Sequence, residues 1–357
     1  MRSLNNREVP VECRGSRRGM VAVFEMALLL AVCVGLVWAI SSSFQSEDSL
    51  QVDRNSPTTY AVTRLFASPD QRHLCFLRSG QGLFRFDLMT STTEKIQPYQ
   101  SDTFIGTDFS QDGRTVLSRR SDETLELYHD GKLAGILPDC QEGDARRFTR
   151  VAEEGQVAVR VAATGRIDGW VHTGPRFVDF SYELSLERVL RFVCLNATGH
   201  RICLVDADGS ASIHETQSGV TAGRTIALGS RVVAVAWSDD ERFLVAVTSD
   251  YKIRRCDLLT GHVDREDALD GNFRDCDFAT LKISKRGNLV AVTTNNSSNI
   301  FLWSDNSATP VKRCTNPSVT VRALDFSPNG DRLYTGGYDG VIREWSIETC
   351  ALVRSIH

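Results

Sequence analysis

Apolar and polar residues alternate along most of the chain in short runs, and each run ends at a turn signal. The C-terminal part shows this best. An apolar run over residues 321–326 is followed by Ser-Pro-Asn-Gly at 327–330, and a second alternating run over 332–345 ends on a tryptophan. A period of two is typical of a strand with one buried face, and glycine at the fourth turn position lets the chain reverse cheaply. This segment is therefore predicted to be short β-strands joined by tight turns.

The same register recurs down the chain at a spacing of about 42 residues, which indicates an internal repeat. The position that opens the turn is Ser68, Ser110, Ala152, Asn196, Ser238, Ser284 and Ser327. The position of the tryptophan is Phe86, Tyr128, Trp170, His214, Cys256, Trp303 and Trp345. The residue before every turn is apolar, which fits the last buried position of a strand. Seven repeats are predicted.

The repeat at Ser327 resembles the WD-repeat family through its turn, its Thr-Gly-Gly-Tyr-Asp-Gly segment and its final tryptophan. The resemblance covers residues 60–357 and implies an all-β fold, a seven-bladed WD-repeat β-propeller. It also implies that Thr335, Asp339 and Trp345 belong to a hydrogen-bonded structural tetrad, although no Gly-His pair precedes this repeat to supply the histidine. The family commonly closes the ring with an N-terminal strand, and whether residues 50–53 supply one is left open.

The N-terminal segment has a different character. Residues 1–20 form a basic tail, residues 21–40 are apolar except for Glu25, and residues 41–58 form a polar linker before the propeller at 59–357. Twenty helical residues rise about 30 Å, enough to cross a bilayer. One transmembrane helix is predicted to act as a signal anchor. Its basic end lies in the cytoplasm, so the propeller is expected outside it.

Two other interpretations of this segment stay open. It is also compatible with a secretory signal that is cleaved. Arg17, Arg18 and Gly19, followed by an apolar run with Glu25, resemble the leaders of type IV pilin-like and TadE-like proteins, in which a peptidase cuts after the glycine.

Composition and motifs reduce the number of function classes that fit the sequence. The net charge of −4 and pI of about 6.0 show no basic excess, so no nucleic-acid partner is expected. No C-x-x-C, paired metal-binding histidines or catalytic motif occurs, and we predict no catalytic residue, cofactor or metal site. Cys194 and Cys203 flank a predicted hairpin and are interpreted mainly as small buried residues.

The chain is therefore predicted to be a membrane-tethered scaffold, not an enzyme, that binds protein partners. One alternative is an exported propeller enzyme or cofactor-binding protein with its site in the central channel, and another is a pilus-like or secretion-apparatus component. Two long connections, at 264–278 and 295–299, are expected to share one face and to bind partners, although solvated insertions would look the same. The candidate partner-binding residues are Arg265, Glu266, Asp267, Asp270, Arg274, Asn295, Asn296 and Asn299.

Overall fold

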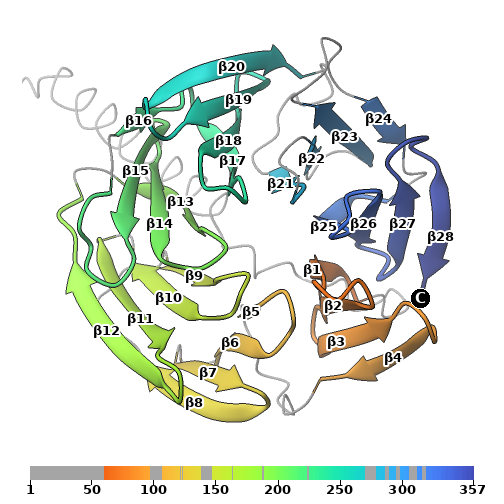
Figure 1. Cartoon of the computed structure of the whole chain (residues 1–357), viewed down its shortest axis with the longest axis horizontal. Coiled ribbons are helices and arrows are strands. Elements are labelled where there is room, and N and C mark those ends of the chain that lie inside the picture. Colours follow the sequence, from red (N-terminus) through yellow and green to blue (C-terminus); the bar gives the residue numbers. More distant parts are fainter. Residues whose placement is uncertain are drawn as a thin grey trace, which may run out of the picture. The chain divides into compact units, whose positions relative to one another are not determined.

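A computed structural model describes residues 60–357, except 97–106, 121, 123, 138–146, 163, 187–188, 223–224, 270–278, 286–288, 295–297, 305–311 and 316–318. Within these ranges the chain forms seven antiparallel four-stranded sheets arranged as blades of a ring (Figure 1). The described part holds no helix that is long and apolar enough to cross a membrane. The predicted anchor at 21–40 lies outside the described residues.

The first four blades take up the chain from residue 62 to residue 227. Blade one is β1 (Val62–Ala67), β2 (His73–Arg78), β3 (Gly82–Asp87) and β4 (Thr92–Lys95). Blade two is β5 (Thr107–Phe109), β6 (Thr115–Arg119), β7 (Leu125–His129) and β8 (Lys132–Leu137). Blade three is β9 (Arg147–Val151), β10 (Val157–Ala162), β11 (Arg166–His172) and β12 (Phe177–Glu183). Blade four is β13 (Leu190–Leu195), β14 (Arg201–Asp206), β15 (Ser210–Glu215) and β16 (Ile226–Ala227).

The last three blades follow in the same order. Blade five is β17 (Val232–Trp237), β18 (Phe243–Thr248), β19 (Lys252–Asp257) and β20 (His262–Ala268). Blade six is β21 (Ala279–Ile283), β22 (Leu289–Thr294), β23 (Asn299–Ser304) and β24 (Lys312–Thr315). Blade seven is β25 (Val321–Phe326), β26 (Arg332–Gly337), β27 (Ile342–Ser346) and β28 (Leu352–Ile356). In every blade the first strand lies innermost and the fourth lies at the rim (Figure 1).

The predicted repeat register is confirmed. The apolar residue before each turn is the last residue of a first strand in all seven blades, and each tryptophan-like position lies on a third strand. The first strands end on one face of the ring, here called the turn face. The turns between second and third strands and the passages between blades lie on the opposite face, here called the connection face.

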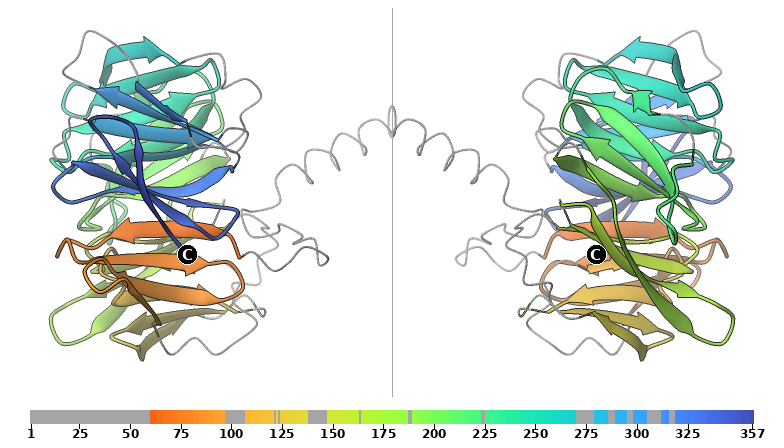
Figure 2. Two further views of the ribbon diagram at one scale, coloured as in Figure 1. Left: turned by 90° about the vertical axis from the view of Figure 1, so that its right-hand side faces the viewer. Right: turned by 90° about the vertical axis from the view of Figure 1, so that its left-hand side faces the viewer.

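The core lies between neighbouring sheets, which stack around the ring (Figure 2). Trp345 of blade seven is 2 % exposed and packs with Leu302 of blade six. Trp303 is 1 % exposed and packs with Val247 of blade five. Both tryptophans are therefore buried between neighbouring blades. A large buried aromatic ring removes much apolar surface from water, so each one helps to hold two blades together.

The turns after the first strands need a left-handed residue at their fourth position. Gly113, Gly155, Gly199 and Gly330 have φ values of 72–80° there. The equivalent residues of blades one and five are Gln71 and Glu241, with φ of 58° and 56°. A side chain at positive φ is strained and glycine is not. The turn itself therefore sets the backbone conformation, and in four of these repeats a glycine adopts it without strain.

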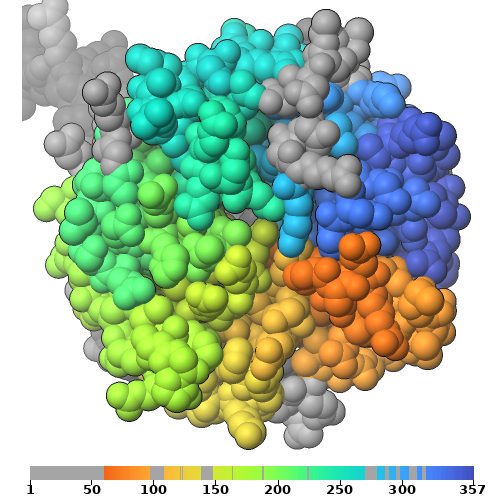
Figure 3. Space-filling model, in the orientation of Figure 1, coloured from red at the N-terminus to blue at the C-terminus, as the bar shows by residue number. Residues whose placement is uncertain are grey.

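Complete blades close the ring. Blade seven consists of four consecutive strands from the C-terminal end, and blade one of four consecutive strands that begin at Val62. β1 lies against β25, where residues from the two ends of the described chain meet near the middle of the ring (Figure 3). Residues 50–53, considered for an added strand, lie outside the described residues.

Candidate functional site in the channel and on the two faces

The tetrad-like residues of blade seven are only partly brought together. The buried Nε1 of Trp345 on β27 donates a hydrogen bond of 2.9 Å to Oγ1 of Thr335 on β26. Asp339, in the turn between these strands, pairs with Arg343 through a contact of 2.5 Å. Its Oδ1 also accepts a hydrogen bond from the amide of Val341 at 3.3 Å. These contacts order the blade from within.

Charged side chains cross the channel. Lys282, at the end of β21 in blade six, places its Nζ 2.6 Å from Oε1 of Glu153, which follows β9 in blade three. Blades four and five lie between these two on one side and blades seven, one and two on the other, so the ion pair spans opposite sides of the ring. Lys285, just beyond β21, donates a hydrogen bond of 3.2 Å to Oε1 of Gln111 in blade two. Both contacts lie at the end of the channel where the first strands finish, which is the turn face.

Several carboxyl groups lie around the Lys282 ammonium group in this cluster. The Lys282 Nζ lies 3.7 Å from Oδ1 of Asp325 and 4.4 Å from the centre of the Phe66 ring. The Lys282 cation holds the pKa of Glu153 below its ordinary value. Burial raises the pKa of Asp325 to about 6 even though Lys282 opposes this. Burial, together with the charge of Glu153, raises the pKa of Asp239 as well. One cation thus serves several carboxyl groups in a confined space.

A lysine side chain of the ring itself occupies the acidic part of the channel. The ammonium group of Lys282 lies where a bound cation would otherwise neutralise Glu153 and Asp325. The described residues include no group of three or more histidine, cysteine or acidic side chains placed to hold a metal ion. The geometry is that of a brace between blades.

Polar contacts also join neighbouring blades around the channel. The carboxylate Oδ2 of Asp325 accepts a hydrogen bond from the amide of Ala67, and that of Asp108 accepts one from the amide of Val151. Arg150 in blade three donates through Nε to the carbonyl oxygen of Val193 in blade four at 3.0 Å. In each case a side chain of one inner strand bonds the backbone of the next, which fixes the blades relative to each other.

Known proteins share this fold. The WD40 family model, described as WD domain, G-beta repeat, matches residues 308–346, which contain Thr335, Asp339 and Trp345. The chain is a WD-repeat β-propeller. It is 22% identical over 278 residues to WD repeat-containing protein 82 of Drosophila melanogaster, and the match covers 71% of this chain and 81% of that protein.

A solved structure is similar over nearly the whole ring. The crystal structure of the Myceliophteria thermophila Cps50 (Swd1) β-propeller domain matches with a TM-score of 0.65 at 16% sequence identity. The match covers 82% of this chain and 99% of that domain. At this identity the likeness concerns the fold alone.

The candidate partner-binding residues of the WD-repeat propeller fall in three places. Arg265, Glu266 and Asp267 lie on β20, the outer strand of blade five, so residues 264–268 are strand where a loop was expected. Asp270, Arg274, Asn295 and Asn296 lie outside the described residues. Asn299 is the first residue of β23 and lies opposite Thr315. Whether any of them binds a partner stays a prediction.

The strand at β20 forms because its charged side chains have partners. Glu266 Oε2 lies 2.7 Å from Nε of Arg254 on β19. Arg265 lies over the Trp303 ring, with 4.5 Å between the guanidinium carbon and the ring centre. Asp267 accepts a hydrogen bond from Trp303 Nε1 at 2.5 Å. A search for apolar alternation misses such a strand, whereas alternation of charged residues opposite a basic strand would have indicated it.

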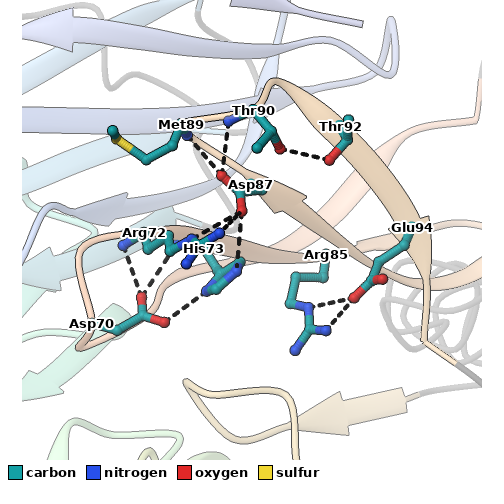
Figure 4. A network of polar contacts seen from close by, with 9 residues as sticks. All are labelled: Asp70, Arg72, His73, Arg85, Asp87, Met89, Thr90, Thr92 and Glu94. Atoms are coloured by element: carbon teal, nitrogen blue, oxygen red, sulfur yellow. Dashed lines mark hydrogen bonds and ion pairs between the residues drawn. The ribbon is translucent and has the colours of Figure 1, made fainter.

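The turn face of blade one carries a dense polar network (Figure 4). Asp87 accepts hydrogen bonds from the amides of Thr90 and Met89 at 2.9 and 2.8 Å and from Nε of Arg72 at 3.0 Å. The Thr90 amide is the main cause that lowers the pKa of Asp87 to about 2. Asp70 accepts from the amide of Arg72, and its other oxygen contacts Nδ1 of His73 at 2.6 Å. The network fixes the turn that exposes Met89.

Proposed function

We propose that this WD-repeat propeller is a protein-binding scaffold, and not an enzyme, held at a membrane by residues 21–40 with the propeller outside the cytoplasm. The observation that carries the scaffold proposal is the ion pair between Lys282 and Glu153 across the channel. Because Lys282 of the ring itself pairs with Glu153 and lies near Asp325 in the channel, the geometry favours binding on the outside of the ring over chemistry on its axis. A rigid ring also suits recognition, since it presents its connections without an ordering cost.

The connection face of blade six is the proposed binding region. The start of β21, the end of β22 and the start of β23 lie at this face, because the strands of blade six are antiparallel. The strands that flank this region are anchored: Leu269 is buried in the core cluster shared with Trp303. Connections held by a rigid scaffold are where binding residues commonly lie. The binding region therefore comprises residues 270–278 and 295–298, while 264–268 supports it as strand.

The test is capture of partners by tagged full-length protein from its own cells, with variants confined to this region. In one variant residues 270–278 are shortened to a Gly-Ser linker, and in another residues 295–298 are replaced by Asn-Gly. The matched controls, Met89→Ser and Leu259→Ser, change turn-face side chains that are 80 % and 91 % exposed. Loss of the same partners from both connection variants, with unchanged melting temperatures and full capture by the controls, supports the proposal. Full capture by all four variants refutes this location.

The membrane proposal rests on the basic residues before 21–40 and the acidic residues after them. Protease added to intact cells or spheroplasts is expected to digest the propeller and to leave the N-terminal tail protected. Mass spectrometry of the mature N-terminus separates a retained anchor from a cleaved signal or a cut after Gly19. A propeller that protease reaches only after lysis would refute the orientation.

A further inference from the structure

Two cysteines meet where blade six adjoins blade seven. Cys314 lies on β24, is 1 % exposed and belongs to the core cluster that contains Trp345. Cys350 lies in the turn between β27 and β28 and packs against the same cluster. Lys312 Nζ donates a hydrogen bond of 3.1 Å to the carbonyl oxygen of Glu348. These two residues each precede one of the cysteines by two positions, so the hydrogen bond holds the two segments in register.

The backbone at Cys350 is unusual for a cysteine. Its φ is 54°, in the left-handed region. The equivalent turn residues are Ser91 in blade one, with φ of 58°, and Gly219 and Gly261 in blades four and five, with φ of 69° and 73°. The turn therefore sets this conformation, which strains a side chain and leaves glycine unstrained. In blade seven the same turn position places a thiol beside Cys314.

We propose that Cys314 and Cys350 form a reversible disulfide that joins blade six to blade seven. Both are free thiols in the structure. Burial and the hydrogen bond with Cys350 raise the pKa of Cys314, so the less buried Cys350 reacts first. Its thiolate attacks a low-molecular-weight disulfide such as oxidised glutathione, which forms a mixed disulfide and releases one thiol. The Cys314 thiolate then displaces the second thiol, so two electrons and two protons pass to the oxidant.

The link would act between blades, which distinguishes it from the other close pair of cysteines. Cys194 and Cys203 lie opposite each other on β13 and β14 of one sheet. A bond there would join strands that are already paired in the ladder. A bond between Cys314 and Cys350 would join the outer strand of one blade to a turn of the next. Because it closes a longer loop of chain, it removes more freedom from the unfolded state.

The test compares purified full-length protein equilibrated with oxidised glutathione and with dithiothreitol. Digestion without reduction is expected to yield one peptide pair that joins the segments around residues 314 and 350, with a mass two hydrogens below the sum of the free peptides. The melting temperature of the oxidised protein is expected to be higher by about 5 °C or more. Absence of this peptide pair after oxidation overturns the proposal, whichever other pair forms.

Three variants separate the bond from simple packing. Cys350→Gly removes the thiol and relieves the left-handed strain, so the variant is expected to fold and to melt at the same temperature under both redox conditions. Cys350→Ser is expected to lose the redox difference while it keeps the strain. The matched control, Cys194→Ser, is expected to retain the full difference. A redox difference that persists in Cys350→Gly would refute the assignment.

Discussion

Asp325 at the end of β25 accepts a hydrogen bond of 2.8 Å from the backbone amide of Ala67 in β1, 258 residues away in sequence. The contact between Asp108 and the amide of Val151 has the same form at 3.0 Å and joins blades two and three. The interface that closes the ring is therefore built like one inside it. An aspartate before the turn of one blade satisfies a backbone donor of the next, which needs no strand exchanged between the chain ends.

The Asp325 carboxyl makes ring closure sensitive to pH. Burial raises its pKa from 3.8 to about 6, so the folded protein binds this proton more tightly than the unfolded chain does. Stability from this group is present below about pH 4 and is lost as pH rises through 6. Compared with Asp325→Asn, which keeps an acceptor without the charge, wild type is expected to lose about 1–3 kcal/mol of unfolding free energy between pH 4 and 7. Denaturant titrations of both proteins measure this, and a difference that does not vary with pH contradicts the account.

Lys282 is expected to contribute more to stability than an exposed lysine does, because it pairs with carboxyl groups inside the channel. Lys282→Met leaves Glu153 and Asp325 without their shared cation and is expected to lower the unfolding free energy by about 3 kcal/mol at pH 7. The loss should be smaller at pH 5, where Asp325 is protonated. Adding Glu153→Gln should restore part of the lost unfolding free energy, because one uncompensated charge is removed.

The control is an exposed lysine. Lys252→Met breaks an exposed ion pair with Glu266 and should lower the unfolding free energy by about 1 kcal/mol or less. Equal losses for the two lysine variants would exclude a special role for the channel.

Sequence alone predicts the ring because its signals are local. The apolar residue before each turn, the glycine at the left-handed position and the tryptophan-like residue on the third strand all lie within one blade. Gln71 and Glu241 adopt the same conformation without glycine, which shows that the spacing carries more information than any single residue. Seven weak copies in one register therefore predict the architecture, although most of them taken singly do not.

The contacts between blades cannot be predicted from these local sequence patterns. Lys282 and Glu153 are 129 residues apart, and their meeting depends on the diameter of the closed ring. The thiols of Cys314 and Cys350 come together only through the packing of two blades. For the charged residues around Arg265 on β20 the sequence predicts a loop, because their pairing with β19 does not appear in a pattern of apolar positions. Contacts between residues that are far apart in sequence can be identified only from the three-dimensional structure of the closed ring.

The left-handed turn positions predict opposite effects of glycine and of its replacement. Gln71→Gly relieves strain at a φ of 58° and is expected to raise the unfolding free energy by about 0.5–1 kcal/mol. Gly330→Ala introduces that strain in open space and should lower it by about 1 kcal/mol. Gly199→Ala should cost more, since its Cβ would lie 2.5 Å from Cβ of Val157. Thermal and denaturant unfolding of the three variants check this order, and a destabilised Gln71→Gly would contradict it.

The hydrogen bond between Trp345 and Thr335 can be measured apart from the packing of the ring. Thr335→Val keeps the shape but leaves the buried Nε1 without its acceptor, which is expected to cost about 1–3 kcal/mol. Trp345→Phe removes the donor together with part of the ring, and Trp345→Ala should cost about 3–5 kcal/mol by leaving a cavity. In the Trp345→Phe background, Thr335→Val should cost little, because no donor is left unpaired. Unfolding free energies of wild type, both single variants and the double variant give the coupling, expected at about 1–3 kcal/mol. Thr335→Ser, which retains the hydroxyl, serves as the control, and a coupling of zero would mean that Trp345 stabilises blade seven by packing alone.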